Sequence, residues 1–411
     1  VLDVEARVSL YQTPAEELDS VGGLAATGDG ARVFGFSLCT NALYRVSEVD
    51  AMFNLDTQTF GGVSRSSGIS LNETGSELYL LHPHALAVVN PETLDVIETI
   101  SGRGAGPMRL ALSQDDSTLF ASLSGRNEVV AVSTTGGPIA WRQRLGSRPF
   151  SLSVGPLPGA LYVSSPGFFW TPDDRVFQMN SATGNFIEKA HPSFKGPVII
   201  KAISVMDKEF ALVGSTGDFT NHLDNDGGSN KIGIISQWDP VGGAVEEVVK
   251  FPDMDDQSFL VIPRSISDFQ VRLTNGDYNG LAASAISRND CADGRDNNVL
   301  ALFSPPAPNV FFPDENNTVE DNKVCSAAFV ALNRDATRRA SSSFEPDSTG
   351  QHFVTFFDIS SNPERIVKVP VEGRNPADIE FSPDGQFVFV AAYNGKTVEL
   401  IRYELDSASE D

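Results

Sequence analysis

Positively charged residues recur just before short apolar stretches of the chain. The segments that carry them are Ser64–Ser66, Gly106–Arg109, Ser147–Pro149, Lys195–Pro197, Pro263–Ser265 and Gly373–Pro376. Arginine recognises carboxylates and phosphates through two parallel hydrogen bonds, so a cluster of arginines would bind an anion. The candidate anion-binding residues are Arg65, Arg109, Arg148, Arg264 and Arg374. The alternative is a structural role, in which each cation bonds loop carbonyls or pairs with nearby acids such as Asp378.

Two acidic segments that contain glycine, 224–230 and 290–298, space their oxygen atoms as calcium-binding loops do. Calcium prefers carboxylate and carbonyl oxygens, and glycine lets the chain turn around the ion. The candidate metal ligands are Asp224 and Asp226 in the first segment and Asp290, Asp293 and Asp296 in the second. Neither segment ends in the glutamate of an EF-hand, so a solvated turn is the alternative. Ca²⁺ is the cofactor that this pattern predicts.

The chain is strongly acidic, with 54 Asp and Glu residues against 30 Lys and Arg residues and a net charge of −24. A surface of this charge repels phosphate backbones and anionic membranes, which argues against general nucleic-acid binding. No apolar run reaches the length of about 18 residues that a membrane-spanning helix needs. We therefore expect a protein partner or a small anionic ligand, without nucleic acid and without membrane insertion.

The three cysteines bear on the compartment in which the protein works. Cys291 and Cys325 share one irregular region and are expected to form a disulfide, which leaves Cys39 free. A disulfide suits an oxidising compartment, whereas three separate thiols are the alternative. The chain begins Val1–Asp3 without methionine, which we interpret as a mature product without its export signal, or as a trimmed chain. The expected location is extracellular, at the cell surface or periplasmic.

The elements that would position these residues repeat along the chain. Turn signals begin at Thr27, Asn72, Gln114 and Pro156, with spacings of about 42 to 45 residues. They precede predicted strands at 32–36, 77–81, 118–122 and 160–164. In most copies a third and a fourth short apolar strand follow. Four strands in each unit, repeated at this spacing, predict the blades of a β-propeller.

The two ends of the chain are expected to share one blade. The last copy of the repeat supplies three strands, and a lone strand at 6–11 precedes the first copy. Pairing of these strands would close the propeller without an open sheet edge. The predicted fold is therefore a single all-β domain over residues 1–411, a seven-bladed β-propeller.

The region 255–372 is less regular than the rest. It contains predicted strands at 267–273, 298–303, 327–332 and 352–357. One interpretation is a single blade with a loop insertion at about 304–324. The other is two irregular blades, which would make the propeller eight-bladed. An insertion of this kind lies on a face of the propeller, where it can shape a binding site.

The clearest copy of the repeat, at 373–401, resembles a known family. Its turn Ser382–Gly385 and the valine-rich strands around it are similar to the YVTN-type, lactonase-like propeller repeats of exported bacterial and archaeal proteins. The family's namesake tetrapeptide is absent, and Val390–Val398 stands in its place. The resemblance implies either a surface protein or an enzyme, since the family includes sugar-lactone hydrolases and the heavy subunits of amine dehydrogenases.

Known catalytic motifs are absent from the sequence. It contains no nucleophile elbow, zinc-protease motif, phosphate-binding loop or haem-attachment motif. We therefore expect a non-enzymatic binding or structural module at the cell surface or in an extracellular assembly. The alternative is a hydrolase of lactones or esters, acting at the propeller axis with Ca²⁺ as Lewis acid.

Overall fold

The computed structural model of the chain describes the residues 4–12, 21–27, 31–37, 42–49, 52–59, 68–72, 74–82, 85–101, 107–134, 139–156, 158–166, 175–188, 197–205, 208–215, 234–250, 265–274, 277–286, 300–303, 318–319, 327–333, 337–343, 350–358, 365–371, 375–382, 385–393 and 398–405. Within these ranges the elements are β-strands and one short 3-10 helix, η1 (Ser124–Arg126). The chain divides into two compact units. Unit 1 comprises Val1–Pro107, Cys291–Asp296 and Lys323–Asp411, and unit 2 comprises Met108–Asp290 and Asn297–Asn322.

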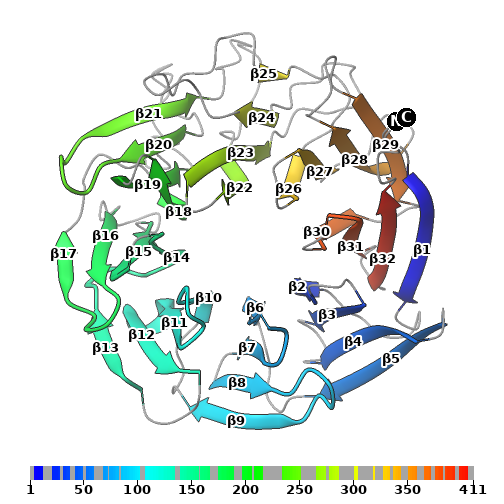
Figure 1. Ribbon diagram of the computed structural model, residues 1–411, viewed down its shortest axis with the longest axis horizontal. Coiled ribbons are helices and arrows are strands. Elements are labelled where there is room, and N and C mark those ends of the chain that lie inside the picture. The colour runs from blue at the N-terminus through cyan, green and yellow to red at the C-terminus, as the bar shows by residue number, and fades with distance from the viewer. Residues whose placement is uncertain are drawn as a thin grey trace. The chain divides into compact units, whose positions relative to one another are not determined.

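Unit 1 contains four-stranded antiparallel sheets in which neighbouring strands follow one another along the chain (Figure 1). One is formed by β2 (Val21–Ala26), β3 (Arg32–Ser37), β4 (Ala42–Val49) and β5 (Met52–Thr59). Another is formed by β6 (Gly68–Leu71), β7 (Leu78–His82), β8 (Ala85–Val89) and β9 (Val96–Ser101). A third is formed by β26 (Ala327–Leu332), β27 (Arg338–Ser343), β28 (His352–Asp358) and β29 (Arg365–Val371). The strands predicted at 32–36 and 77–81 are β3 and β7, so the turn signals place them correctly.

A further sheet of unit 1 joins the two ends of the chain. Its order is β1 (Val4–Gln12), β32 (Val398–Leu405), β31 (Phe387–Tyr393) and β30 (Asn375–Phe381). The N-terminal strand runs antiparallel to the C-terminal strand, with Val8 opposite Arg402. The predicted pairing of the two end strands is therefore confirmed.

Unit 2 continues the pattern of four strands. One sheet contains β10 (Pro107–Leu112), β11 (Thr118–Leu123), β12 (Glu128–Ser133) and β13 (Trp141–Arg144). The next contains β14 (Leu152–Val154), β15 (Ala160–Ser165), β16 (Arg175–Asn180) and β17 (Phe186–Glu188). The strands predicted at 118–122 and 160–164 are β11 and β15.

The remaining strands of unit 2 form one sheet that consists of two sets of four. The first set is β18 (Pro197–Val205), β19 (Lys208–Ser215), β20 (Ile234–Trp238) and β21 (Val245–Lys250). The second set is β22 (Ser265–Thr274), β23 (Asp277–Ile286), β24 (Leu300–Phe303) and β25 (Thr318–Val319). The two sets meet in one parallel pair, Ser204 with Asp277.

The irregular region 255–372 thus contains the four strands β22 to β25 and the four strands β26 to β29. This grouping matches the interpretation with two irregular blades. The short strand β25 lies inside the segment 304–324 that was expected to be a loop, and it pairs with Leu300 and Ala301 of β24. The other residues of that segment lie outside the described part of the chain.

A repeated turn connects the third and fourth strands of several sheets. In each case an Asn or Asp side chain accepts hydrogen bonds from backbone N–H groups two and three residues later, as in Asx turns. The residues that accept these bonds are Asn90, Asn180 and Asp239. Each turn then closes through a residue with positive φ, namely Leu94 (61°), Gly184 (72°) and Gly243 (70°). Local turn chemistry therefore fixes where each fourth strand begins.

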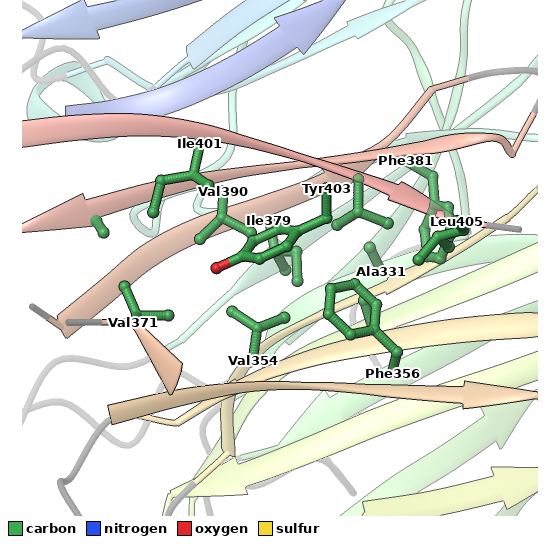
Figure 2. Packing of buried hydrophobic residues seen from close by; sticks show 13 residues of the cluster. Ala331, Val354, Phe356, Val371, Ile379, Phe381, Val390, Ile401, Tyr403 and Leu405 are labelled. Carbon is green, nitrogen blue, oxygen red and sulfur yellow. The ribbon is translucent and has the colours of Figure 1, made fainter. Parts of the chain in front are cut away.

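The hydrophobic core lies between neighbouring sheets. In unit 1, side chains of β28 meet those of β31 and β32 (Figure 2). Phe356 is 1% exposed and packs edge-on against Tyr403, with ring centroids 5.3 Å apart. Val354 and Val390 are fully buried beside them. Burial of side chains of this size stabilises the fold by about 1.5–3 kcal/mol each, so this layer ties the sheet of the chain ends to its neighbour.

Candidate functional site

Ser122 holds together the segments that carry two of the predicted cations. It lies near the end of β11 and is fully buried. Its Oγ accepts a hydrogen bond from the N–H of Arg109 in β10 at 3.0 Å. The same hydroxyl donates to the carbonyl of Phe150 at 2.9 Å. One side chain therefore links the first strand of one sheet to the segment that leads into the next sheet.

In the following sheet, serine side chains at the end of β15 make the same kind of hydrogen bonds. Ser164 Oγ accepts a hydrogen bond from the N–H of Ser151 at 3.1 Å. Ser165 Oγ donates to the carbonyl of Arg148 at 2.7 Å and also bonds the hydroxyl of Ser147 at 2.8 Å. Because both serines are fully buried, these bonds are shielded from competing water. The backbone on either side of Arg148 is therefore fixed.

A third sheet is connected in the same way. Ser151 Oγ accepts the N–H of Ile200 at 3.4 Å, and Ser153 Oγ accepts the N–H of Ala202 at 2.8 Å. Both partners lie in β18. Serine side chains thus form a line of hydrogen bonds across three successive sheets of unit 2.

Arg109 and Arg148 are both exposed, although their backbones are held by buried serines. Ser122 contacts Arg109 directly and contacts Phe150, which follows Arg148 by two residues. Their segments are therefore adjacent. Arg109 lies inside β10 rather than before it, which differs slightly from the expected position. Two guanidinium groups on neighbouring, fixed segments are suited to binding one anion.

All the other predicted site residues lie outside the described part of the chain. This holds for the cations Arg65, Arg264 and Arg374, for the metal ligands Asp224, Asp226, Asp290, Asp293 and Asp296, and for Cys39, Cys291 and Cys325. Among the residues that are described, no group of three or more His, Cys, Asp or Glu side chains could hold a metal ion. Nor does any helix in the described ranges have the length and apolar character needed to cross a membrane.

The sequence did not single out the serines or Glu209. A serine near the end of a strand is ordinary on its own, but its recurrence at Ser122, Ser164 and Ser342 was an available signal. Ser342 of β27 accepts the N–H of Phe329 at 3.2 Å, as Ser122 does for Arg109. Glu209 is half-buried at the start of β19, and its position becomes apparent only from the packing of two sheets.

No protein-family model matches the chain, and no curated protein matches it in sequence. Several solved structures are similar in fold. The C-terminal WD40 domain of Sif2 matches with a TM-score of 0.62 and 12% identity over 97% of this chain and 99% of that chain. The chain has a β-propeller fold. Each set of four strands is accordingly a blade, and the serine line runs from blade to blade.

Two further structures support the same fold. Hydrazine synthase from Kuenenia stuttgartiensis has a TM-score of 0.54 and 17% identity over 82% of this chain and 94% of that chain. The WD40 repeats of RRP9 have a TM-score of 0.53 and 11% identity over 99% of this chain and 100% of that chain. At such low identities the likeness shows the fold and leaves the function to the residues themselves.

Proposed function

We propose that this propeller is a binding module that recognises an anionic group, a carboxylate on a partner protein, through Arg109 and Arg148. The observation that carries the proposal is the bridge made by Ser122 between the segments of these two arginines. A binding residue is most effective on a backbone that does not move, because less conformational entropy is then lost on binding.

The charge of the protein gives the proposed site its selectivity. The chain has a net charge of −24, so its surface is expected to repel anions in general. Two cations on adjacent segments would form a positively charged area on that surface. An acidic partner would be repelled elsewhere and held here, so electrostatics would fix its orientation more than its overall affinity. Binding should therefore weaken as the salt concentration rises.

The experiment uses a synthetic hexaglutamate peptide as the probe and measures its binding to the whole chain by calorimetry. The double variant Arg109→Gln/Arg148→Gln should lose about tenfold to hundredfold in affinity, since hydrogen bonds to charged groups contribute about 1.5–3 kcal/mol. The matched control is Arg144→Gln, which removes an exposed arginine of β13 in the same unit. Equal affinity of the double variant and the control would contradict the proposal.

Finer features belong to the same proposal. We propose eight blades, supported by the two sets of strands β22–β25 and β26–β29. We also propose an extracellular or cell-surface location and a relation to the YVTN-type repeats, supported by the acidic composition and by the pattern at 373–401. In that pattern Gly385 adopts a φ of 74°, and its N–H donates to the carbonyl of Ser382 at 2.8 Å, which supports the predicted turn.

A further inference from the structure

Glu209 lies at the edge of a hydrophobic layer between two blades of unit 2. The layer is formed by side chains of β15, β16, β18, β19 and β20. Its largest members are Tyr162 and Trp238, both fully buried, which meet edge-on with ring centroids 6.1 Å apart. Glu209 stands at the start of β19 and marks the edge of this layer. A carboxyl group in such a place affects how well the two blades pack.

The carboxyl group of Glu209 lies against fixed backbone. A Cβ atom at Gly155 would be only 1.8 Å from Glu209 Oε1, so the glycine leaves the room that this oxygen occupies. The loop itself is held in place, because the N–H of Gly155 donates to the carbonyl of Ala160 at 2.9 Å and its carbonyl accepts from Gln114 Nε2 at 3.0 Å. Oε1 is buried and has no hydrogen-bond partner among the described residues. The burial of this one oxygen is therefore not compensated by a hydrogen bond.

The polar and charged groups that surround Glu209 do not neutralise it. From β15 and β16, Tyr162 faces the carboxyl group while its own oxygen accepts from Gln178 Nε2 at 2.9 Å. Within β19, the ammonium group of the preceding residue, Lys208, donates to Asp239 Oδ2 at 2.6 Å. Burial by itself raises the pKa of Asp239, but bonds from Gly242, Lys208 and Val241 outweigh it and lower that pKa. The cation that precedes Glu209 in β19 is thus bonded to another carboxylate.

These contacts favour the uncharged form of Glu209. Burial raises its pKa to about 7, and the hydrogen bond with Tyr162 only partly opposes the increase. In the unfolded chain the same group would ionise near its ordinary pKa of about 4.3. Between these values the folded state holds a proton that the unfolded state has lost, so stability falls as the pH rises from about 4.3 to about 7. Above that range the folded protein carries a charge in the layer.

We propose that Glu209 is a pH-sensitive latch between two neighbouring blades. With a neutral carboxyl group, β19 packs closely on Gly155 and Tyr162. With an ionised carboxyl group, the buried oxygen draws water toward the seam and this part of unit 2 opens more often. The device would adjust blade packing, and with it the serine line that ends in β18, to the pH around the protein.

Hydrogen exchange of the whole chain tests the latch. Protection factors for β15 and β19 should fall about tenfold between pH 5 and pH 8, a value that discounts the pKa difference for the partial exposure of the group. Glu209→Gln keeps the shape and cannot ionise, so its protection factors should change little over this range. The matched control is Glu188→Gln, which alters an exposed glutamate of β17 and should retain the pH dependence of the wild type.

A second variant covers the case in which Glu209→Gln disturbs folding. Tyr162→Phe removes the hydrogen bond that lowers the pKa of Glu209, so the midpoint of the pH response should move to higher pH. Two results would overturn the latch. One is a fall in protection that is the same in the wild type and in Glu209→Gln. The other is a midpoint that does not change, or moves to lower pH, in Tyr162→Phe.

Discussion

Replacement of Ser122 by alanine removes the hydroxyl group that links Arg109 to Phe150. The side chain is fully buried, so water cannot take its place freely. The N–H of Arg109 and the carbonyl of Phe150 both lose a hydrogen-bond partner. A hydrogen bond of this kind contributes about 0.5–1.5 kcal/mol net. The two lost bonds together give a loss of up to roughly 3 kcal/mol in the free energy of unfolding.

The assay is thermal unfolding of Ser122→Ala beside the wild type. For a unit of this size, 1 kcal/mol corresponds to about 2–4 °C in Tm, so a decrease of up to roughly 6–12 °C is expected. The matched control is Ser181→Ala, because the bonds recorded for Ser181 involve its backbone, which donates to Gly159 and accepts from Trp141. That variant should unfold within about 2 °C of the wild type.

The same variant also bears on binding. If Ser122 positions the two arginines, Ser122→Ala should bind the hexaglutamate peptide more weakly at a temperature where it is fully folded, whereas Ser181→Ala should not. An unchanged Tm in Ser122→Ala would refute the structural reasoning. A lowered Tm with unchanged binding would refute the positioning role alone.

Three further outcomes are expected. Phe356→Ala should lower the free energy of unfolding, measured by chemical denaturation, by about 3–5 kcal/mol, because it leaves a cavity beside Tyr403. Gly184→Ala should lower the Tm more than Gly243→Ala. Both glycines have φ near 70°, so the backbone strain of alanine is similar at the two positions. A Cβ at Gly184 would lie 2.6 Å from the Trp141 ring, whereas no atom lies within 4 Å of a Cβ at Gly243. If the segment 224–230 is the one that binds calcium, about 1 mM Ca²⁺ should raise the Tm of the wild type but not of Asp224→Asn/Asp226→Asn. Equal Tm losses in the two glycine variants, or a calcium response that survives the aspartate changes, would contradict these expectations.

The strands and turns of this fold are encoded locally, which is why the sequence predicts them well. The turn at Asn180 depends on an Asx side chain and on Gly184 a few residues later, and both are visible in the sequence. Apolar runs such as 160–164 lie between such turns and become strands. The pairing of the two end strands followed from a count of strands, since one copy of the repeat was a strand short.

The candidate site was predictable only in part, because it depends on contacts between blades. Arginine at a repeated position pointed to Arg109 and Arg148, but the bonds that hold their segments together come from Ser122, a residue type common in strands. Glu209 gave no signal, since its environment is made by Gly155 and Tyr162 of another blade. Such contacts depend on how sheets pack, which local sequence patterns do not record.

The most direct test of the central claim is a double-mutant cycle on peptide binding. The affinities of the wild type, Arg109→Gln, Arg148→Gln and the double variant for hexaglutamate would be measured under one salt condition. If both arginines hold the same anion, their effects should be coupled by about 0.5–3 kcal/mol. Strictly additive effects, or no effect in either single variant, would contradict a shared anion site.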